Sequence, residues 1–172
     1  MKPALHTLSF PGAMVQRGFW LYVWRVQLPE SEVLYVGRTG DNSSPHATAP
    51  YTRMGQHLGN IKTQNALRKH LKARGVEPQD CEKFELIAFG PLYPEVSDPN
   101  LDRKGLFQLH QPFRNIVGAQ ERELARELKN AGYDVLNTVK WRHEPDLKLR
   151  DDIRDEFATH FPKLNDAMGD VA

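Results

Sequence analysis

The sequence predicts a small α/β domain in which helices flank a three-stranded, mainly antiparallel sheet. Two short runs rich in aromatic and β-branched residues, 20–26 and 32–37, are separated by a polar turn that contains Pro29. This pattern is typical of a β-hairpin. A similar run at 83–89 is expected to add a third strand beside the hairpin. Apolar residues at helical spacing lie between and after these runs, which indicates helices that pack on the sheet.

Helical spacing recurs in four stretches of the chain. We expect a first helix from residue 51, with an apolar stripe that reaches Ile61, and a second helix over 65–74. The clearest helix covers 116–131, after which 133–137 returns to the core as a short strand or extended segment. A last, added helix near the C-terminus is indicated by four apolar residues spaced four apart, Leu149, Ile153, Phe157 and Phe161.

The connecting segments lack such periodicity. Residues 41–50 form a loop that is long for a compact domain, which suggests a functional or mobile segment. Residues 90–113 contain four prolines and are expected to form a long connection. We divide the chain into an N-terminal arm (1–18), one domain (19–140) and a C-terminal helical extension packed on that domain (141–172).

The composition excludes several classes of protein. A hydrophobic content of 40% and a net charge of +1 are ordinary for a soluble globular protein. The single cysteine excludes an intrachain disulfide framework and a cysteine-rich zinc site. No apolar run approaches the length of a membrane span, and the first residues lack the layout of a signal peptide. We therefore expect a cytoplasmic protein without a membrane partner.

The near-zero net charge hides two poles of opposite sign. No Asp or Glu occurs between residues 42 and 76, whereas the segment from residue 144 onward carries eight acids against four basic residues. The first segment is expected to form a basic surface that a nucleic-acid backbone approaches, although an ordinary solvated helix would look similar. The expected nucleic-acid contacts are Arg38, Lys62, Arg68, Lys69, Lys72 and Arg74.

Residue types suited to phosphodiester hydrolysis recur along these elements. Arg53 and His57 lie four positions apart, so their side chains share one helix face. Glu121 occupies the apolar stripe of its helix and must be buried beside the sheet or face a cleft, whereas Glu123 and Glu127 lie off the stripe and are expected in solvent. The candidate catalytic residues are Tyr22, Tyr35, Arg38, Arg53, His57, Glu121 and Asn137.

These side chains meet the chemical needs of that reaction. A hard cation held by one carboxylate and water neutralises the phosphate and the leaving oxygen. A guanidinium offers a planar fork of donors to phosphate oxygens. A tyrosine or histidine carries the proton when nearby cations lower its pKa. Taken singly, each residue also fits a structural role on a helix surface, at a core edge or at a strand end.

Both strands of the predicted hairpin carry short motifs. Trp20-Leu21-Tyr22 and Tyr35-Val36-Gly37 resemble the two signature motifs of the GIY-YIG nuclease superfamily. The resemblance covers about residues 19–137. Two departures are that Trp20 replaces the glycine of the first motif, and that more residues than usual separate the second motif from Arg53.

Further residues resemble the family in the same order along the chain. Arg53-Met-Gly-Gln-His57 resembles the arginine-x-x-x-histidine of some restriction enzymes of this superfamily. Glu121 begins a segment that resembles the helix of the metal-binding glutamate, and Asn137 resembles the asparagine that ends the last strand. Arg38 stands where several relatives have a basic residue after the second motif.

The resemblance implies an endonuclease that hydrolyses DNA with Mg²⁺ or Mn²⁺. Glu121 would hold the ion and Arg53 would bind the scissile phosphate. Tyr22 or Tyr35, helped by His57, would activate water. Arg38 would supply positive charge near the phosphate. Asn137 would position the glutamate or one of the tyrosines.

Two other functions remain open from the sequence. The first is a non-catalytic module that keeps this fold and binds nucleic acid. The second is a protein-interaction module that docks on a partner through its C-terminal helix. A homodimer also remains open. DNA specificity would come from the loops 41–50 and 90–113 or from dimerisation.

Overall fold

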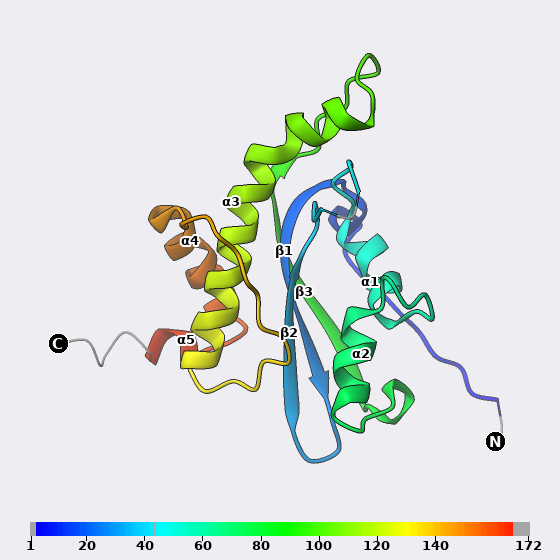
Figure 1. Ribbon diagram of the computed structural model, residues 1–172. Coiled ribbons are helices and arrows are strands. Elements are labelled where there is room, and N and C mark those ends of the chain that lie inside the picture. The colour runs from blue at the N-terminus through cyan, green and yellow to red at the C-terminus, as the bar shows by residue number, and fades with distance from the viewer. Residues whose placement is uncertain (1–2, 43, 167–172) are drawn as a thin grey trace.

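The computed structural model describes residues 3–42 and 44–166. Its centre is a three-stranded antiparallel sheet in the order β2-β1-β3 (Figure 1). The strands are β1 (Gly18–Gln27), β2 (Glu32–Arg38) and β3 (Lys83–Pro94). Helices cover both faces of this sheet, which confirms the α/β fold class predicted from the sequence.

The predicted hairpin is present, and β3 pairs with its first strand. In the hairpin register Tyr22 lies opposite Gly37 and Trp24 lies opposite Tyr35. β3 continues past residue 89, where the sequence predicts its end, as far as Pro94. Prolines are tolerated there because β3 is an edge strand of the three-stranded sheet, where a missing N–H removes no ladder hydrogen bond.

Side chains of the strands alternate between two cores. On one face Tyr22, Trp24 and Tyr35 pack with the short helices α1 (Pro50–Leu58) and α2 (Ala66–Ala73). On the other face strand residues pack with three helices, which are α3 (Arg103–Asn130), α4 (Leu147–Ala158) and α5 (Lys163–Asp166). Two short 3₁₀ helices complete the described elements, η1 (Gly12–Val15) and η2 (Pro78–Asp80).

The first helix is shorter than its apolar pattern suggests. It ends at Leu58, and Ile61 is 62% exposed instead of extending the buried stripe. Gly59 follows directly in an extended conformation, and its N–H donates to the carbonyl of Gln56. A glycine at this position ends the helix readily because it favours non-helical backbone, so the i, i+4, i+7 spacing overstates the helix.

Helix α3 is much longer than predicted and includes Pro112 in its interior. It begins inside the segment expected to be a loop, where the Asp102 carboxylate caps it by accepting a 2.7 Å hydrogen bond from the Gly105 N–H. Two buried side chains, His110 and Arg114, anchor this first half to the rest of the chain. Those tertiary contacts offset the backbone hydrogen bond that the proline cannot donate.

The segment after α3 returns to the sheet, as predicted. The N–H of Leu34 in β2 donates to the carbonyl of Asp134, and the N–H of Leu136 donates to the carbonyl of Leu34, at 2.8 and 2.7 Å. Leu34 and Val135 form a parallel bridge. This segment therefore covers the outer edge of β2, and the opposite edge of the sheet is β3.

The C-terminal helices complete the core on the α3 face. Ile153 and Phe157 of α4 and the following Phe161 are buried in that core. These side chains therefore cover the sheet of their own chain, and docking of a partner through them would require that α4 leave the core. No helix in the described parts of the chain combines the length and apolarity that crossing a membrane requires.

Candidate active site

The hydroxyl of Tyr22 is the centre of a buried polar cluster. Its oxygen lies 2.7 Å from Nε2 of His57 and accepts a 3.5 Å hydrogen bond from Nε of Arg53. It also lies 3.3 Å from the carbonyl oxygen of Arg38, to which it can donate. The structure thus brings together the first motif tyrosine and the arginine–histidine pair of α1.

Local sequence explains this arrangement. Tyr22 points to the α1 face of the sheet, and Arg53 and His57 share the helix face that meets it. Gly37 lies opposite Tyr22 in the hairpin, and a Cβ at Gly37 would lie 2.5 Å from Cε2 of the tyrosine ring. The glycine of the second motif is therefore required by the close approach of the ring to the β2 backbone.

Burial keeps the cluster uncharged apart from Arg53. Burial, together with the positive charge of Arg53, lowers the pKa of His57 to about 3, so the imidazole is neutral near pH 7. Burial raises the pKa of Tyr22 to about 12, although Arg53 opposes this shift. The pKa of Tyr35 is also raised, first by burial and then by Tyr22. The neutral imidazole can accept a proton from the phenol, but its low pKa makes it a weak base unless a negative charge comes close to it.

We expect the stability of the protein to fall in mild acid because of His57. The folded pKa of about 3 lies below the ordinary value of 6.5, so below pH 6.5 the unfolded state takes up a proton that the folded state refuses. His57 therefore leaves the free energy of unfolding unchanged above pH 6.5. Between pH 6.5 and pH 3 it lowers that free energy by up to about 1.4 kcal/mol for each unit by which the pH falls. Urea unfolding at pH 7.5, 6.5, 5.5 and 4.5 measures the slope.

His57→Gln should flatten this pH dependence. Burial also lowers the pKa of the less buried His70, so His70→Gln is the comparison variant and should change the slope less. An equal slope in wild type and His57→Gln between pH 6.5 and 4.5 would contradict the buried, neutral state of His57.

Glu121 is held at the edge of the sheet by Arg38. The Arg38 Nε donates a 2.9 Å hydrogen bond to Oε2 of Glu121, and its Nη1 donates to the carbonyl of Arg114 at 3.0 Å. The guanidinium also lies 4.3 Å from the ring centre of Trp141. Burial raises the pKa of Glu121, and the Arg38 charge opposes that rise.

This geometry changes the role expected for Arg38. Its side chain is only 5% exposed and is surrounded by Glu121, the Arg114 carbonyl and Trp141. It was expected both to contact the nucleic acid and to supply charge near the phosphate, but its position fits the positioning of Glu121 better. The sequence cannot indicate this because Arg38 and Glu121 are 83 residues apart.

The Asn137 side chain binds the backbone of β2. Its Nδ2 donates to the carbonyl of Val36 at 2.7 Å, and its Oδ1 accepts from the Val36 N–H at 3.0 Å. The side-chain amide thus pairs with β2 as a neighbouring strand would. Asn137 thus holds the part of β2 that carries Tyr35, so the expected positioning of a tyrosine would act through the backbone of this strand.

Asp41 is a further site residue that sequence reasoning missed. Its Oδ2 lies 2.9 Å from Nη2 of Arg53, while Nη1 of Arg53 donates to Oε1 of Gln56 at 3.0 Å. Asp41 also contributes to the raised pKa of Glu121, which places the two carboxyl groups in one electrostatic environment. The only sequence signal is the position of Asp41, four residues after the second motif.

The described part of the loop after β2 is anchored to α3. The buried Arg114 donates to the carbonyls of Gly40 and Ser44 at 3.1 and 2.7 Å, and also to the carbonyl of Asp41. Nδ1 of His110 lies 2.8 Å from the carbonyl oxygen of Pro45. A sequence signal exists, since two polar residues four positions apart on one helix face can reach the same loop.

A polar cavity of about 540 Å³ opens beside Arg53. Its walls come from the loop after β2, from α1 and from the segment that leads into α2, and they carry hydroxyl, amide and imidazole groups. It gives a phosphate group a route to the Arg53 guanidinium. The lining residues are Gly40, Asp41, Ser44, His46, Thr48, Arg53, Gln56, Thr63, Gln64 and Ala66.

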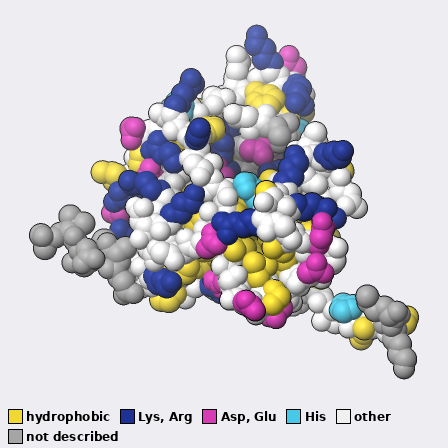
Figure 2. Space-filling view, turned by 60° about the horizontal axis from the view of Figure 1, so that its bottom comes forward, with side chains coloured by type: hydrophobic (Ala, Val, Ile, Leu, Met, Phe, Trp, Pro, Cys, Tyr) yellow, Lys and Arg dark blue, Asp and Glu magenta, His cyan; other side chains and the backbone are white. Residues whose placement is uncertain are grey.

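The basic residues around α2 are partly neutralised. Arg74 forms a bidentate pair with Asp134, and Lys72 pairs with Glu77 at 3.1 Å. Arg68 donates to the carbonyl of Leu58 at 3.2 Å. Figure 2 shows Lys and Arg side chains over one side of the molecule, with Asp and Glu side chains next to several of them. Any phosphate contact from this region would therefore rely most on two exposed lysines, Lys62 in the turn before α2 and Lys69 on α2.

The residues present fit a single hard cation at Glu121. The described part of the chain contains no group of three or more His, Cys, Asp or Glu side chains that could hold a metal. Glu121 is 14% exposed, and its Oε2 accepts from Arg38, which leaves Oε1 as the oxygen for a cation. A cation would also relieve the repulsion from Asp41. Water and substrate oxygens would complete the coordination.

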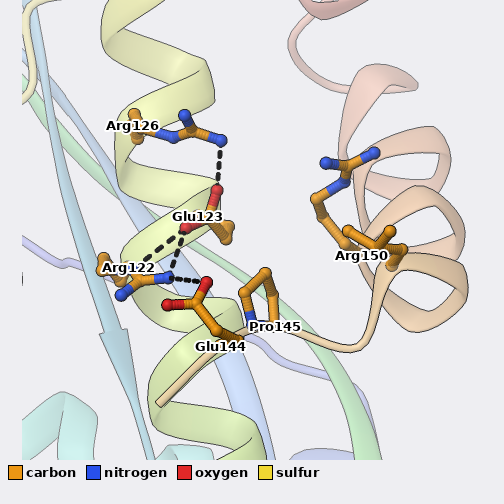
Figure 3. Close-up of a pocket in the computed structure, with 7 residues that line it drawn as sticks. Arg122, Glu123, Arg126, Glu144, Pro145 and Arg150 are labelled. Carbon is orange, nitrogen blue, oxygen red and sulfur yellow. Dashed lines mark hydrogen bonds and ion pairs between the residues drawn. The ribbon is translucent and has the colours of Figure 1, made fainter. Parts of the chain in front are cut away.

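A second cavity, of about 590 Å³, lies between α3 and α4 (Figure 3). Glu123 lines it and is buried, contrary to the expectation of a solvated residue, because Arg122 and Arg126 pair with its carboxylate. Glu144 pairs in turn with Arg122 at 3.7 Å. Arg122 and Arg126 pair with the acids of this cavity, and Arg150 pairs with Asp151 outside its lining, so the cavity offers little unpaired charge to a ligand.

Fold and site together define a three-stranded α/β domain with a buried tyrosine–histidine–arginine cluster and a neighbouring arginine–glutamate pair. Comparisons with protein-family models, with curated proteins and with solved structures give no match to the chain. The resemblance to the GIY-YIG nucleases therefore rests on the sequence motifs alone.

Proposed function

We propose that this protein is a metal-dependent endonuclease of the GIY-YIG type that cleaves DNA. The observation that carries the proposal is the 2.7 Å contact between the Tyr22 hydroxyl and Nε2 of His57, next to the Arg53 guanidinium. A phenol in contact with a neutral imidazole can relay a proton, and a guanidinium beside it can hold the phosphate that water attacks.

In the proposed reaction Tyr22 takes a proton from the attacking water and passes its own proton to Nε2 of His57. The water oxygen bonds to phosphorus, and the bond from phosphorus to the leaving oxygen breaks. Arg53 donates to the non-bridging oxygens. A Mg²⁺ or Mn²⁺ ion held by Glu121 would supply positive charge to the phosphate and the leaving oxygen. The negative charge of a bound phosphate would stabilise the protonated form of His57, which burial disfavours when no phosphate is bound.

Arg53 must exchange partners during this reaction. In this structure its Nη2 lies 2.9 Å from the Asp41 carboxylate, at a place where a phosphate oxygen would otherwise bind. The Asp41 side chain is 30% exposed, so it can turn toward solvent when a phosphate enters the cavity. Substrate binding would thus replace one anionic partner of the guanidinium by another.

Nicking of supercoiled plasmid in the presence of Mg²⁺, with an EDTA control, tests the proposal. Arg53→Ala should reduce the initial rate by about 10²–10³-fold, because it removes the donors that stabilise charge on the phosphate. Lys148→Ala, a charge loss on the exposed surface of α4, is the matched control and should nick normally. Equal nicking in EDTA, or full activity of Arg53→Ala, would contradict the assignment.

A non-catalytic nucleic-acid-binding module is the second candidate. It is favoured by the internal pairing of the site, since Arg53 already pairs with Asp41 and Arg38 already pairs with Glu121. In that case DNA binding would weaken with rising salt concentration, and no Mg²⁺-dependent nicking would occur.

A further inference from the structure

The first half of α3 carries a polar stripe on one face. Lys104, Gln108, Gln111 and Asn115 follow one another at intervals of four, three and four residues, which places them along one side of the helix. The first three are exposed and Asn115 is partly exposed. They line a shallow concavity of about 610 Å³ together with Phe107 and Pro112.

A second concavity, of about 290 Å³, continues the stripe. It shares Gln111 and Asn115 with the first concavity and adds Asn42 from the loop after β2. Its other wall is the segment 140–143, which supplies two exposed basic side chains and two aromatic rings. The residues of that wall are Lys140, Trp141, Arg142 and His143. None of the residues that line either concavity is an acid.

Trp141 connects this surface to the candidate active site. Its Nε1 donates to the carbonyl of Asn115 at 3.0 Å, and its ring lies under the Arg38 guanidinium that holds Glu121. The ring packs so closely on α3 that a Cβ at Gly118 would lie 2.4 Å from its Cε2. The surface therefore begins at the site and extends along α3 towards its N-terminal end.

The side chains of the stripe are preorganised for hydrogen bonding. Nε2 of Gln111 donates to Oδ1 of Asn115 at 2.9 Å, which orients both amides. This leaves Oε1 of Gln111 as an acceptor and Nδ2 of Asn115 as a donor toward a ligand. Figure 1 shows that the first half of α3 projects past the sheet, so another macromolecule can approach it from outside.

We propose that this surface, the α3–Trp141 surface, reads base edges in the major groove of duplex DNA. This inference rests on the proposed endonuclease function, and it gives the candidate active site its selectivity for a DNA sequence. The major groove admits an α-helix, and Gln and Asn side chains pair with adenine edges there. The lysines and Arg142 supply phosphate contacts at both ends of the stripe, and no lining carboxylate repels the backbone.

Selection of bound fragments from a random duplex library, in EDTA so that nothing is cleaved, tests this inference. Wild type should enrich a sequence. Gln108→Ala and Gln111→Ala should each lose preference at one or two positions and bind the selected site about 10-fold more weakly. Lys104→Ala should weaken binding to all sequences alike and reduce the slope of log affinity against log salt by about 1.

Controls keep the result specific to this surface. Gln79→Ala and Lys148→Ala remove an exposed amide and an exposed lysine elsewhere, and both should select and bind as wild type does. Thermal unfolding checks that every variant is folded. The same selected sequence and affinity in wild type and all stripe variants would overturn the inference, as would a wild type that enriches no sequence.

Failure of the inference and failure of the proposed function give different results. Loss of selectivity in the stripe variants, with no Mg²⁺-dependent cleavage of the selected site by wild type, supports the surface and overturns the endonuclease. Cleavage at unchanged positions by wild type and stripe variants supports the endonuclease and overturns the surface.

Discussion

Glu121→Gln is expected to abolish Mg²⁺-dependent cleavage while leaving the protein folded. The substitution removes the negative charge that would hold the cation but keeps an oxygen that can accept from Nε of Arg38. We expect the initial rate of plasmid nicking to fall by about 10³-fold, the upper range for loss of one group that stabilises charge in a transition state. Isothermal titration with Mn²⁺ should show weakened binding in the same variant.

The choice of glutamine follows from the burial of Arg38. Glu121→Ala would leave a guanidinium that is only 5% exposed without its carboxylate, which typically costs about 3–5 kcal/mol. Loss of activity in that variant would then report loss of stability as well as chemistry.

Glu123→Gln is the matched control for Glu121→Gln. Glu123 lies two positions away on the same helix, is also buried, and pairs with Arg122 and Arg126 at the α3–α4 cavity. Its loss should lower stability and leave the rate per folded molecule unchanged. Wild-type nicking by Glu121→Gln, or equal inactivation of both variants at equal stability, would remove Glu121 from the site.

Tyr22→Phe is expected to have the second large effect. The phenylalanine ring keeps the packing in the core, but the hydroxyl that contacts His57 and Arg53 is lost. Loss of a positioned proton carrier should lower the cleavage rate by about 10²–10⁴-fold. Leaving the partner groups unpaired in the interior should lower stability by about 1–3 kcal/mol, which urea unfolding measures.

Tyr35→Phe separates the two motif tyrosines. The Tyr35 ring lies 5.0 Å from the His57 ring, between centres, whereas the hydroxyl that contacts Nε2 of His57 belongs to Tyr22. Its burial matches that of Tyr22 closely enough to make it a control for packing. Activity retained in Tyr35→Phe and lost in Tyr22→Phe would identify Tyr22 as the proton carrier, and the reverse result would contradict the proposed mechanism.

Local patterns in the sequence identify most of the fold. The hairpin, the third strand and the helices of both faces follow from alternation and helical spacing, because these patterns record which side of each element is apolar. Arg53 and His57 are found together for the same reason, since a spacing of four residues places them on one helix face. The return of the segment around Val135 to the sheet is likewise a local apolar signal.

Local patterns fail where distant contacts outweigh them. The first half of α3 falls in the segment 90–113, whose four prolines predict a long connection, yet His110 and Arg114 anchor it as a helix to the loop after β2. Glu123 lies off the apolar stripe, yet it is buried because its carboxylate pairs with Arg122 and Arg126, which are themselves partly exposed. In each case the deciding contacts are charged or polar pairs, which the periodicity of apolar residues does not record.

By itself, the sequence determined the three-stranded sheet, most of the helices that flank it and most residues of a candidate site, Asp41 excepted. Only the tertiary structure decided how that site is connected, with Tyr22 on His57, Arg53 on Asp41 and Arg38 on Glu121. The physical reason is the separation along the chain of the residues that are in contact. Periodicity reflects burial within one element, whereas a hydrogen bond or ion pair joins residues tens of positions apart once the elements have packed.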